Sequence, residues 1–153
     1  MNNYPAWWNK TVTIYNKFVD SSTQQISCYR TVVENCFWKN ENQRYRIGQS
    51  YNSKVILESK DIICRIPKDD RYVDKRAWKE MSANERSNYF TLGNNDIIIL
   101  GEVDDVIDEY TKGKRSNDVL TKYKEYDECL EVDTYVINTG DGVPIEHYRV
   151  NGV

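Results

Sequence analysis

The chain has 153 residues and a net charge of −3, with 39% hydrophobic and 29% charged residues. This length suits one domain with its own core, and the small net charge excludes a uniformly basic, polyanion-binding protein. The four cysteines show no C-x-x-C spacing, and the first residues lack the basic start and apolar run of a secretory segment. We therefore expect reduced thiols in a cytosolic product. No stretch has the length needed to span a membrane.

The chain begins with features typical of a β-protein. Residues 1–9 are predicted to form an irregular arm, whose Trp7 and Trp8 either cap the core or dock on a neighbour. Residues 11–19 then alternate as a half-buried strand does, and Asp20 opens a turn.

A second strand is predicted over 25–38. Its even-numbered residues from Ile26 to Val32 are expected to face inward, with Arg30 as an exception. The pattern changes at Glu34 and Asn35, which predicts a bulge or a bend there.

Polar and charged stretches separate the next expected elements. Residues 39–53 are long, polar and poor in aliphatic side chains, so we expect a loop with a role of its own. Strands are predicted at 54–58 and 61–66. A charged loop is expected over 68–79.

The middle of the chain carries a helix signal and a hairpin signal. Ser82 and Glu85 have the spacing of a capping box, which predicts a short helix over 83–89. A hairpin is expected to follow, and its apolar run 97–100 predicts a strand that is covered on both faces.

Two helices and further strands are expected in the last third. Acidic residues surround an i, i+3, i+4, i+7 apolar pattern from Val103 to Tyr110, and a similar pattern follows Ser116. A strand is predicted over 129–138, and another over 146–150. The expected fold is thus mainly β (α+β), a small antiparallel barrel or sandwich with short helices. We expect one domain, 1–153, made of an arm (1–9), a barrel core (10–103), an acidic helical part (104–127) and C-terminal strands (128–153).

No catalytic, cofactor-binding or metal-binding constellation is predicted. His147 is the only histidine, and no serine or cysteine has an evident base partner in the sequence. The acidic residues could bind a hard cation, but their spacing is not that of a calcium loop and suits the end of a helix. We therefore expect no enzymatic activity and no cofactor. The acidic residues in question are Asp104, Asp105, Asp108 and Glu109.

Charge is distributed unevenly along the chain. Residues 1–101 hold 15 Lys and Arg against 11 Asp and Glu, whereas residues 102–133 hold 5 against 11. Complementary patches could join copies head to tail, although each charge could equally belong to a solvated face. The candidate inter-subunit residues are Trp7, Trp8, Lys68, Arg71, Lys75, Arg76, Asp104, Asp105, Asp108 and Glu109.

Several strand segments carry a resemblance to a known class of protein. They read Val-Thr-Ile-Tyr-Asn-Lys, Tyr-Arg-Thr-Val-Val-x-Asn-Cys-x-Trp, Asp-Ile-Ile-Cys-Arg-Ile-Pro and, later, Asp-Ile-Ile-Ile-Leu-Gly-Glu. Over residues 10–103 the chain resembles the small head–tail connector proteins of long-tailed bacteriophages, in particular head-closure (stopper) proteins. The part after residue 103 departs from that pattern, since many members of the class are shorter.

The resemblance implies a fold and a function. Such proteins are small β-barrels that form a ring beneath the portal and adaptor, close the DNA-filled head and dock the tail. They reside in the virion and are made in the host cytoplasm. A long loop points into the channel in some members, and its counterpart here is 39–53, with Arg44, Tyr45 and Arg46 as the candidate channel residues that could contact packaged DNA.

Other functions stay open from the sequence. A tail-terminator or minor capsid protein would share the resemblance. A free nucleic-acid-binding β-barrel is a second class, since basic and aromatic residues alternate at 44–46 and within 68–78. A small hydrolase or metal-dependent enzyme is a third.

Overall fold

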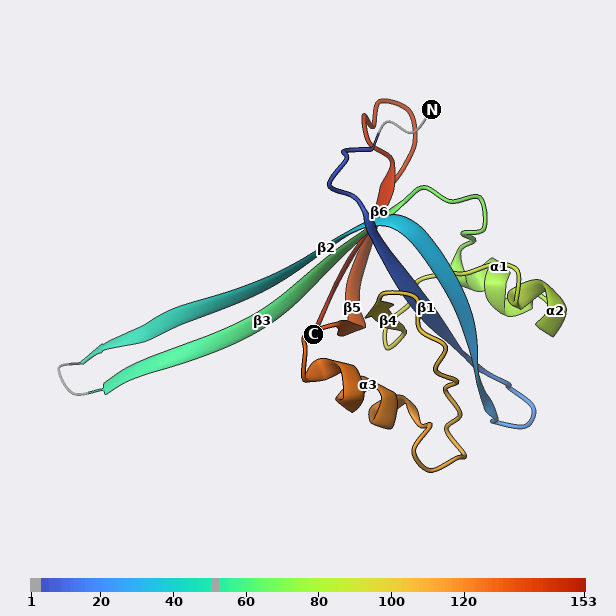
Figure 1. Ribbon diagram of the computed structural model, residues 1–153, viewed down its shortest axis with the longest axis horizontal. Coiled ribbons are helices and arrows are strands. Elements are labelled where there is room, and N and C mark those ends of the chain that lie inside the picture. Colours follow the sequence, from blue (N-terminus) through green and yellow to red (C-terminus); the bar gives the residue numbers. More distant parts are fainter. Residues whose placement is uncertain (1–3, 51–52) are drawn as a thin grey trace.

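The computed structural model describes the backbone of residues 4–50 and 53–153, and the side chains of residues 4–41 and 61–153. Its described strands form a closed antiparallel barrel in the order β1-β2-β3-β6-β5-β4 (Figure 1), which confirms the prediction of a mainly β fold. The strands are β1 Lys10–Val19, β2 Ile26–Ser50, β3 Ser53–Pro67, β4 Ile97–Leu100, β5 Cys129–Asn138 and β6 His147–Gly152. The helices are α1 Lys75–Glu80, α2 Ala83–Arg86 and α3 Ser116–Lys124.

The barrel interior is filled by branched apolar side chains from all six strands. Val12 and Ile14 of β1 meet Ile98 of β4 and Leu130 of β5, and all four are fully buried. Side chains two residues apart on a strand point to the same face, so each strand contributes one of its two faces to this cluster. The burial of these side chains is the main stabilising contribution to the barrel.

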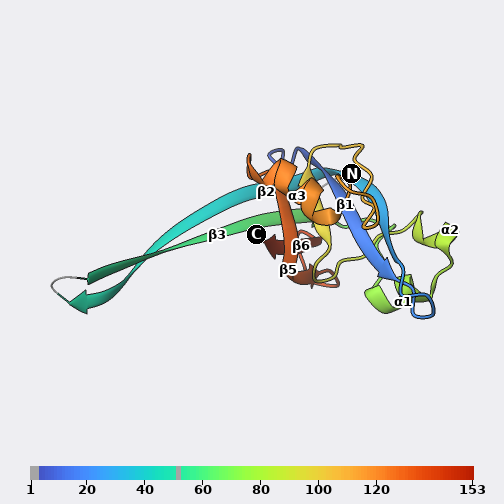
Figure 2. The ribbon, with the colours of Figure 1, turned by 90° about the horizontal axis from the view of Figure 1, so that it is seen from below.

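A second apolar cluster covers the outside of the barrel over β1, β4 and β5. Ile97 and Ile99 point outward from β4 and pack with Tyr15 of β1 and with Val119 and Leu120 of α3. Figure 2 shows α3 lying against this side of the barrel. Strand β4 is therefore buried on both faces, as its uninterrupted apolar run predicts.

The facing of β2 differs from the expectation, although its bulge is confirmed. Asn35 has φ of 61°, and the β1–β2 register shifts opposite it, between Lys10 and Val12. Val33, and not Val32, lies in the barrel interior, whereas Cys28 packs against the outer cluster. Ile26, Cys28 and Val32 are apolar and half-buried because the outer face of β2 is itself partly covered.

The predicted loop 39–53 is wrong, as is the division of 54–66 into two strands. Strand β2 continues to Ser50 and β3 begins at Ser53, with the two paired from Phe37–Arg65 onward. Figure 1 shows the pair extending beyond the barrel as a two-stranded ribbon. Main-chain hydrogen bonds between two strands can form such a ribbon without the apolar alternation that marks a barrel strand.

The predicted acidic helix at 103–110 is also wrong, so the acidic part contains α3 as its one described helix. The carbonyl of Val103 accepts from Arg30 Nε at 2.7 Å, and that of Asp105 accepts from the Tyr15 hydroxyl at 2.6 Å. These carbonyls bond to side chains of the barrel instead of to amides one turn ahead. The segment therefore lies along the barrel wall with Ile107 buried and Val106 exposed.

The charged segment 68–79 is not a loop throughout, because its second half forms α1. Asp74 caps this helix by accepting from the Ala77 amide at 2.9 Å. Helix α2 follows with the predicted capping box between Ser82 and Glu85. Both helices pack beside the β1–β2 hairpin through the buried Trp78.

Candidate assembly surfaces

The two tryptophans of the N-terminal arm lie in different environments. Trp8 is buried, stacks on Tyr4 with ring centroids 5.3 Å apart, and meets His147 edge-on at 5.5 Å. Trp7 is 67% exposed. Of the two alternatives, Trp8 therefore caps the barrel, and Trp7 remains the candidate for docking on a neighbour.

His147 is held by structural contacts. Its Nδ1 lies 2.9 Å from the Ile145 carbonyl, and its Nε2 lies 3.3 Å from the Asn138 side-chain amide. A neutral ring that donates from Nδ1 and accepts at Nε2 satisfies both contacts. Trp8 also packs against the imidazole ring, so these contacts give His147 a structural role.

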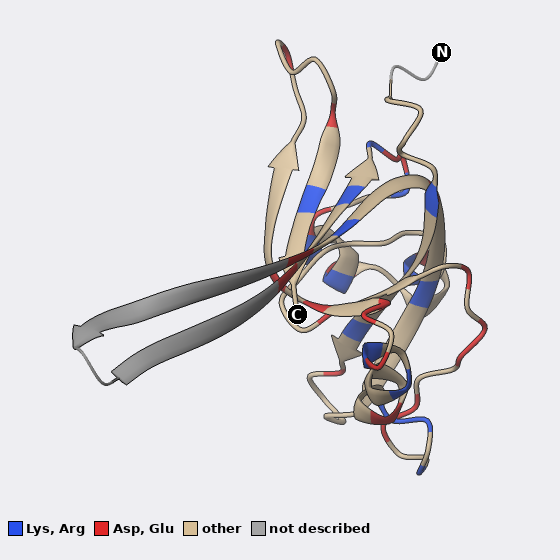
Figure 3. Cartoon of the chain, turned by 60° about the vertical axis from the view of Figure 1, so that its left-hand side comes forward, with Lys and Arg blue, Asp and Glu red and all other residues tan. Residues whose placement is uncertain are grey.

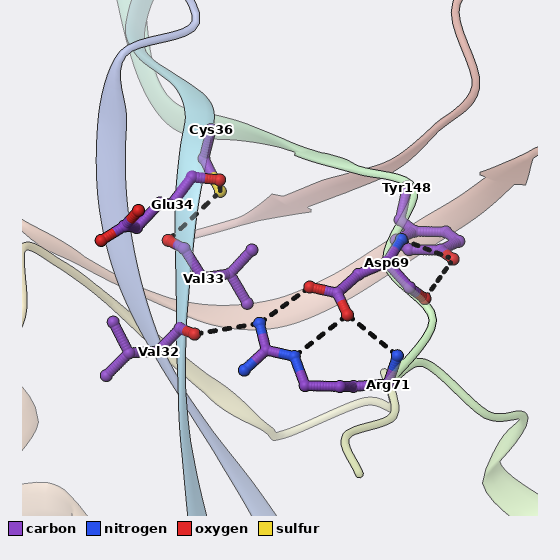
Figure 4. A network of polar contacts seen from close by, with 7 residues as sticks. All are labelled: Val32, Val33, Glu34, Cys36, Asp69, Arg71 and Tyr148. Atoms are coloured by element: carbon purple, nitrogen blue, oxygen red, sulfur yellow. Dashed lines mark hydrogen bonds and ion pairs between the residues drawn. The ribbon is translucent and has the colours of Figure 1, made fainter. Parts of the chain in front are cut away.

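A groove of about 520 Å³ opens where β2 and β3 diverge beside Pro67. Arg71 contributes to its lining, and Figure 4 shows its guanidinium between Asp69 and Val32. The guanidinium donates to both carboxylate oxygens of Asp69, at 3.0 and 2.7 Å, and to the Val32 carbonyl on the open edge of β2, at 3.1 Å. Burial opposes ionisation of Asp69, but the side-chain and backbone hydrogen bonds from Arg71 outweigh it and lower the pKa of Asp69. Arg71 thus covers a strand edge within its own chain.

The other basic candidates are Lys68, directly after β3, and Lys75 and Arg76, which are consecutive on α1. Figure 3 shows basic residues in several separate parts of the chain. Lys68 pairs with Glu146 at 3.3 Å. Lys75 lies against Gly93, where an added Cβ would come within 2.1 Å of Nζ. Arg76 is exposed on α1. The structure therefore leaves Arg76 as the candidate whose side chain is most accessible to a neighbour.

The four acidic candidates do not form one cluster. Asp108 accepts from the Tyr110 amide at 2.9 Å and Glu109 from the Ser116 amide at 3.0 Å, so both stabilise local turns and the start of α3. Asp105 accepts from the Tyr123 hydroxyl. Asp104 is exposed and contacts Arg30 at 3.5 Å. Asp104 is thus the acidic residue at which charge reversal can report on assembly without breaking a buried contact.

We predict that the Tyr123 hydroxyl controls the ionisation of Asp105. The hydrogen bond from Tyr123 lowers the pKa of Asp105, with a smaller effect from Lys122, whose Nζ lies 3.2 Å away. Tyr123→Phe should therefore raise the pKa of Asp105 more than Lys122→Ala does, as measured by NMR titration of the carboxyl carbon.

The hydrogen bond between Tyr123 and Asp105 also makes the stability of the fold depend on pH. Because the folded pKa of Asp105 lies below its unfolded value, this group stabilises the fold above about pH 4 and loses that contribution as the pH falls through the folded pKa. Tyr123→Phe should flatten this acid limb in urea unfolding. An equal effect of both substitutions on the pKa would contradict the assignment.

The candidate channel residues Arg44, Tyr45 and Arg46 belong to β2, but their side chains lie outside the described residues.

Nearer the barrel, a pocket of about 230 Å³ lies between the ribbon base and α3. Asn40, Asp61 and Lys124 contribute to its lining.

A surface that the sequence analysis missed lies on β5. Tyr135, Val136 and Ile137 are 37%, 52% and 39% exposed. The sequence offered one signal of this surface, the uncharged run 134–138. The alternating pattern by itself predicted only an ordinary half-buried strand there.

The described residues offer neither a metal site nor a membrane-spanning helix. No group of three or more His, Cys, Asp or Glu side chains is placed to hold a metal ion. The four cysteines are free thiols, and burial raises the pKa of the Cys129 thiol to about 11. No helix in the described part of the chain combines the length and apolar character needed to cross a membrane.

Comparison with known proteins places the chain at the level of a family. No match was found among curated proteins or among solved structures. A family model matches residues 7–153, nearly the whole chain, including the barrel, the ribbon and α3. The protein therefore belongs to DUF6751, a family of unknown function.

Proposed function

We propose that the protein is a structural component of a bacteriophage head–tail connector, where copies form a ring that closes the DNA-filled head and docks the tail. The observation that carries this proposal is the β2–β3 ribbon. Strand β1 pairs with β2 only as far as Cys36, and β6 pairs with β3 only as far as Ile62. Beyond these residues, β2 and β3 pair with each other and with no other strand in the described part of the chain.

An isolated two-stranded ribbon buries little apolar area and is marginally stable in water. Contacts with neighbouring copies would therefore stabilise a ribbon of this length. In a ring, ribbons of adjacent copies would meet around the channel, and Arg44 and Arg46 would supply cations for DNA phosphates. This agrees with the resemblance, which implies a channel element between the second and third strands.

The surfaces of the barrel also suit a ring. A ring needs two different patches on each copy, which meet head to tail. Trp7 and Arg76 offer an exposed aromatic ring and an exposed cation, and Asp104 offers an exposed anion elsewhere on the barrel. Under this proposal the protein is not an enzyme and needs no cofactor. It would be made in the bacterial cytoplasm and reside in the virion beside portal-side and tail-side proteins.

The proposal predicts that the ribbon is needed for assembly but not for the barrel. We would replace residues 42–60 by Asn-Gly, because Glu41 and Asp61 are paired and can flank a two-residue hairpin turn. The shortened protein should keep the melting temperature of the barrel to within about 5 °C, since the described members of the interior cluster all lie outside residues 42–60.

The shortened protein should fail to join portal-side partners from the same phage in native mass spectrometry, whereas the full-length protein joins them as a ring. Phage particles that carry the shortened protein should lose DNA or lack tails. Normal particles would contradict the proposal. So would a full-length monomer that shifts single-stranded DNA in a salt-dependent way, which is the behaviour of a free nucleic-acid-binding barrel.

A further inference from the structure

Strand β5 has an open edge along its second half. Strand β4 pairs with β5 over Cys129–Glu131, and the last bonds on that side join Val132 to Asn95 and Asp96. Over Thr134–Asn138, β5 pairs with β6 alone among the described residues. Pairing with β6 holds this stretch of β5 in register. The amides and carbonyls of β5 that point away from β6 have no strand partner there among the described residues.

This edge also lacks the usual protection against pairing. Exposed edges in soluble proteins are commonly guarded by lysine, proline or an inward-pointing charge. Residues 134–138 contain no charge and no proline, and three consecutive apolar side chains are exposed there. The bulge between Val132 and Thr134 lies before the run and does not interrupt it.

We propose that the edge is a dimer interface in which β5 of a second copy pairs antiparallel across a two-fold axis at Val136. A two-fold axis perpendicular to the sheet keeps each side chain on its own face. Only registers centred on a residue are therefore possible. Centring on Val136 places Val136 opposite its own copy, Tyr135 opposite Ile137, and Thr134 opposite Asn138.

This register is complementary at each position. Aromatic and β-branched residues opposite one another stabilise paired strands, and here Tyr135 meets Ile137 twice. Both residues share a face with Val150 and Tyr148, their partners on β6, which are buried in the barrel. The dimer would thus extend an apolar face that already exists.

The neighbouring register is disfavoured by charge. Centring on Tyr135 would set the carboxylate of Asp133 opposite Ile137 and remove that charge from water. The Val136 register instead leaves Asp133 at the margin, opposite Thr139. A second copy is therefore favoured over a strand of unrelated sequence, because the edge already complements itself.

The contact is small. Stable interfaces bury about 800 Å² on each partner, and a five-residue edge supplies less, so a monomer–dimer equilibrium that depends on concentration is expected. The inference does not rest on the proposed function. The dimer uses β5, whereas the ring uses the ribbon and the charged surfaces, so either can fail alone.

Sedimentation of the full chain over a range of concentrations tests the dimer. The wild type should associate, and Val136→Lys should abolish association because two ammonium groups would meet on the axis. Val106→Lys is the matched control, since Val106 is 66% exposed away from β5 and should associate like the wild type. A wild type that stays monomeric at all concentrations, or association unaffected by Val136→Lys, would overturn the proposal.

Disulfide trapping tests the register. Directly opposed residues are about 4.5–5.5 Å apart between Cα atoms, which suits a disulfide, so V136C should cross-link two copies under mild oxidation. T134C should not, because the two sulfurs would be offset by about 13 Å along the strands. Wild-type protein controls for the native thiols, of which Cys36, Cys64 and Cys129 are buried. Equal cross-linking of V136C and T134C would exclude this register.

Discussion

Replacing Trp78 with alanine is expected to lower the free energy of unfolding by about 3–5 kcal/mol. Trp78 is fully buried and is the residue through which α1 contacts the β1–β2 hairpin. Its ring meets Phe18 and Tyr29 edge-on, with centroids 6.0 and 5.4 Å apart. Truncation would leave a cavity that the two short helices cannot fill, because α1 has 6 residues and α2 has 4.

Arg86 adds to the expected loss. Its guanidinium carbon lies 3.7 Å from the centre of the Phe18 ring and 6.0 Å from that of Trp78, and Arg86 is 8% exposed. Its Nη1 donates to the carbonyl of Met81, which ties α2 to the end of α1. Without the indole ring this buried cation would lose part of its cation–π stabilisation.

Urea unfolding followed by far-UV circular dichroism measures the effect. Trp7→Ala is the matched control, and because Trp7 is 67% exposed we expect a change within about 0.5 kcal/mol. Trp78→Phe should fall between the two. If Trp78→Ala cost less than about 1 kcal/mol, Trp78 would not anchor the helices.

Replacing Asn16 with alanine is expected to cost about 2–4 kcal/mol near pH 7, because it leaves several buried polar groups without partners. The Asn16 amide donates to the Thr91 carbonyl at 2.7 Å and to the Asp96 carboxylate at 2.9 Å. Its carbonyl accepts from the Thr91 amide at 3.2 Å. All three residues are at most 2% exposed, so water cannot replace the lost bonds.

The loss should depend on pH. Burial raises the pKa of Asp96, against the opposing bonds from the Lys17 amide and Asn16. A folded pKa above the unfolded value means that the contribution of Asp96 to stability falls as the pH rises through the folded pKa. Removing the Asn16 donor raises that pKa further. The variant should therefore lose more stability near pH 7 than near pH 4.

Denaturation of wild type and Asn16→Ala at both pH values checks this expectation. Asn94→Ala is the control, because Asn94 lies in the adjacent turn but is exposed. Its effect should stay within about 0.5 kcal/mol at either pH. If the loss of stability in Asn16→Ala did not change with pH, it would not depend on the ionisation of Asp96.

Local sequence patterns determined the elements that depend on local chemistry. Alternation located β1 and β5, and the apolar run of β4 indicated burial on both faces. The Ser82 capping box located α2, and the change of pattern at Glu34 located the bulge. Each of these signals arises from contacts within a few residues, or from the strand period itself, and so is present in a single chain.

Only the tertiary structure decided where pairing continues and where it stops. The polar stretch 39–50 is strand because β3 lies beside it, and Val103–Tyr110 is not helical because Arg30 and Tyr15 bind its carbonyls. The open edge over 134–138 exists because β4 begins only at Ile97, which pairs with Glu131. The presence or absence of hydrogen-bond partners distant in sequence decides all three features, and side-chain periodicity carries no record of such partners.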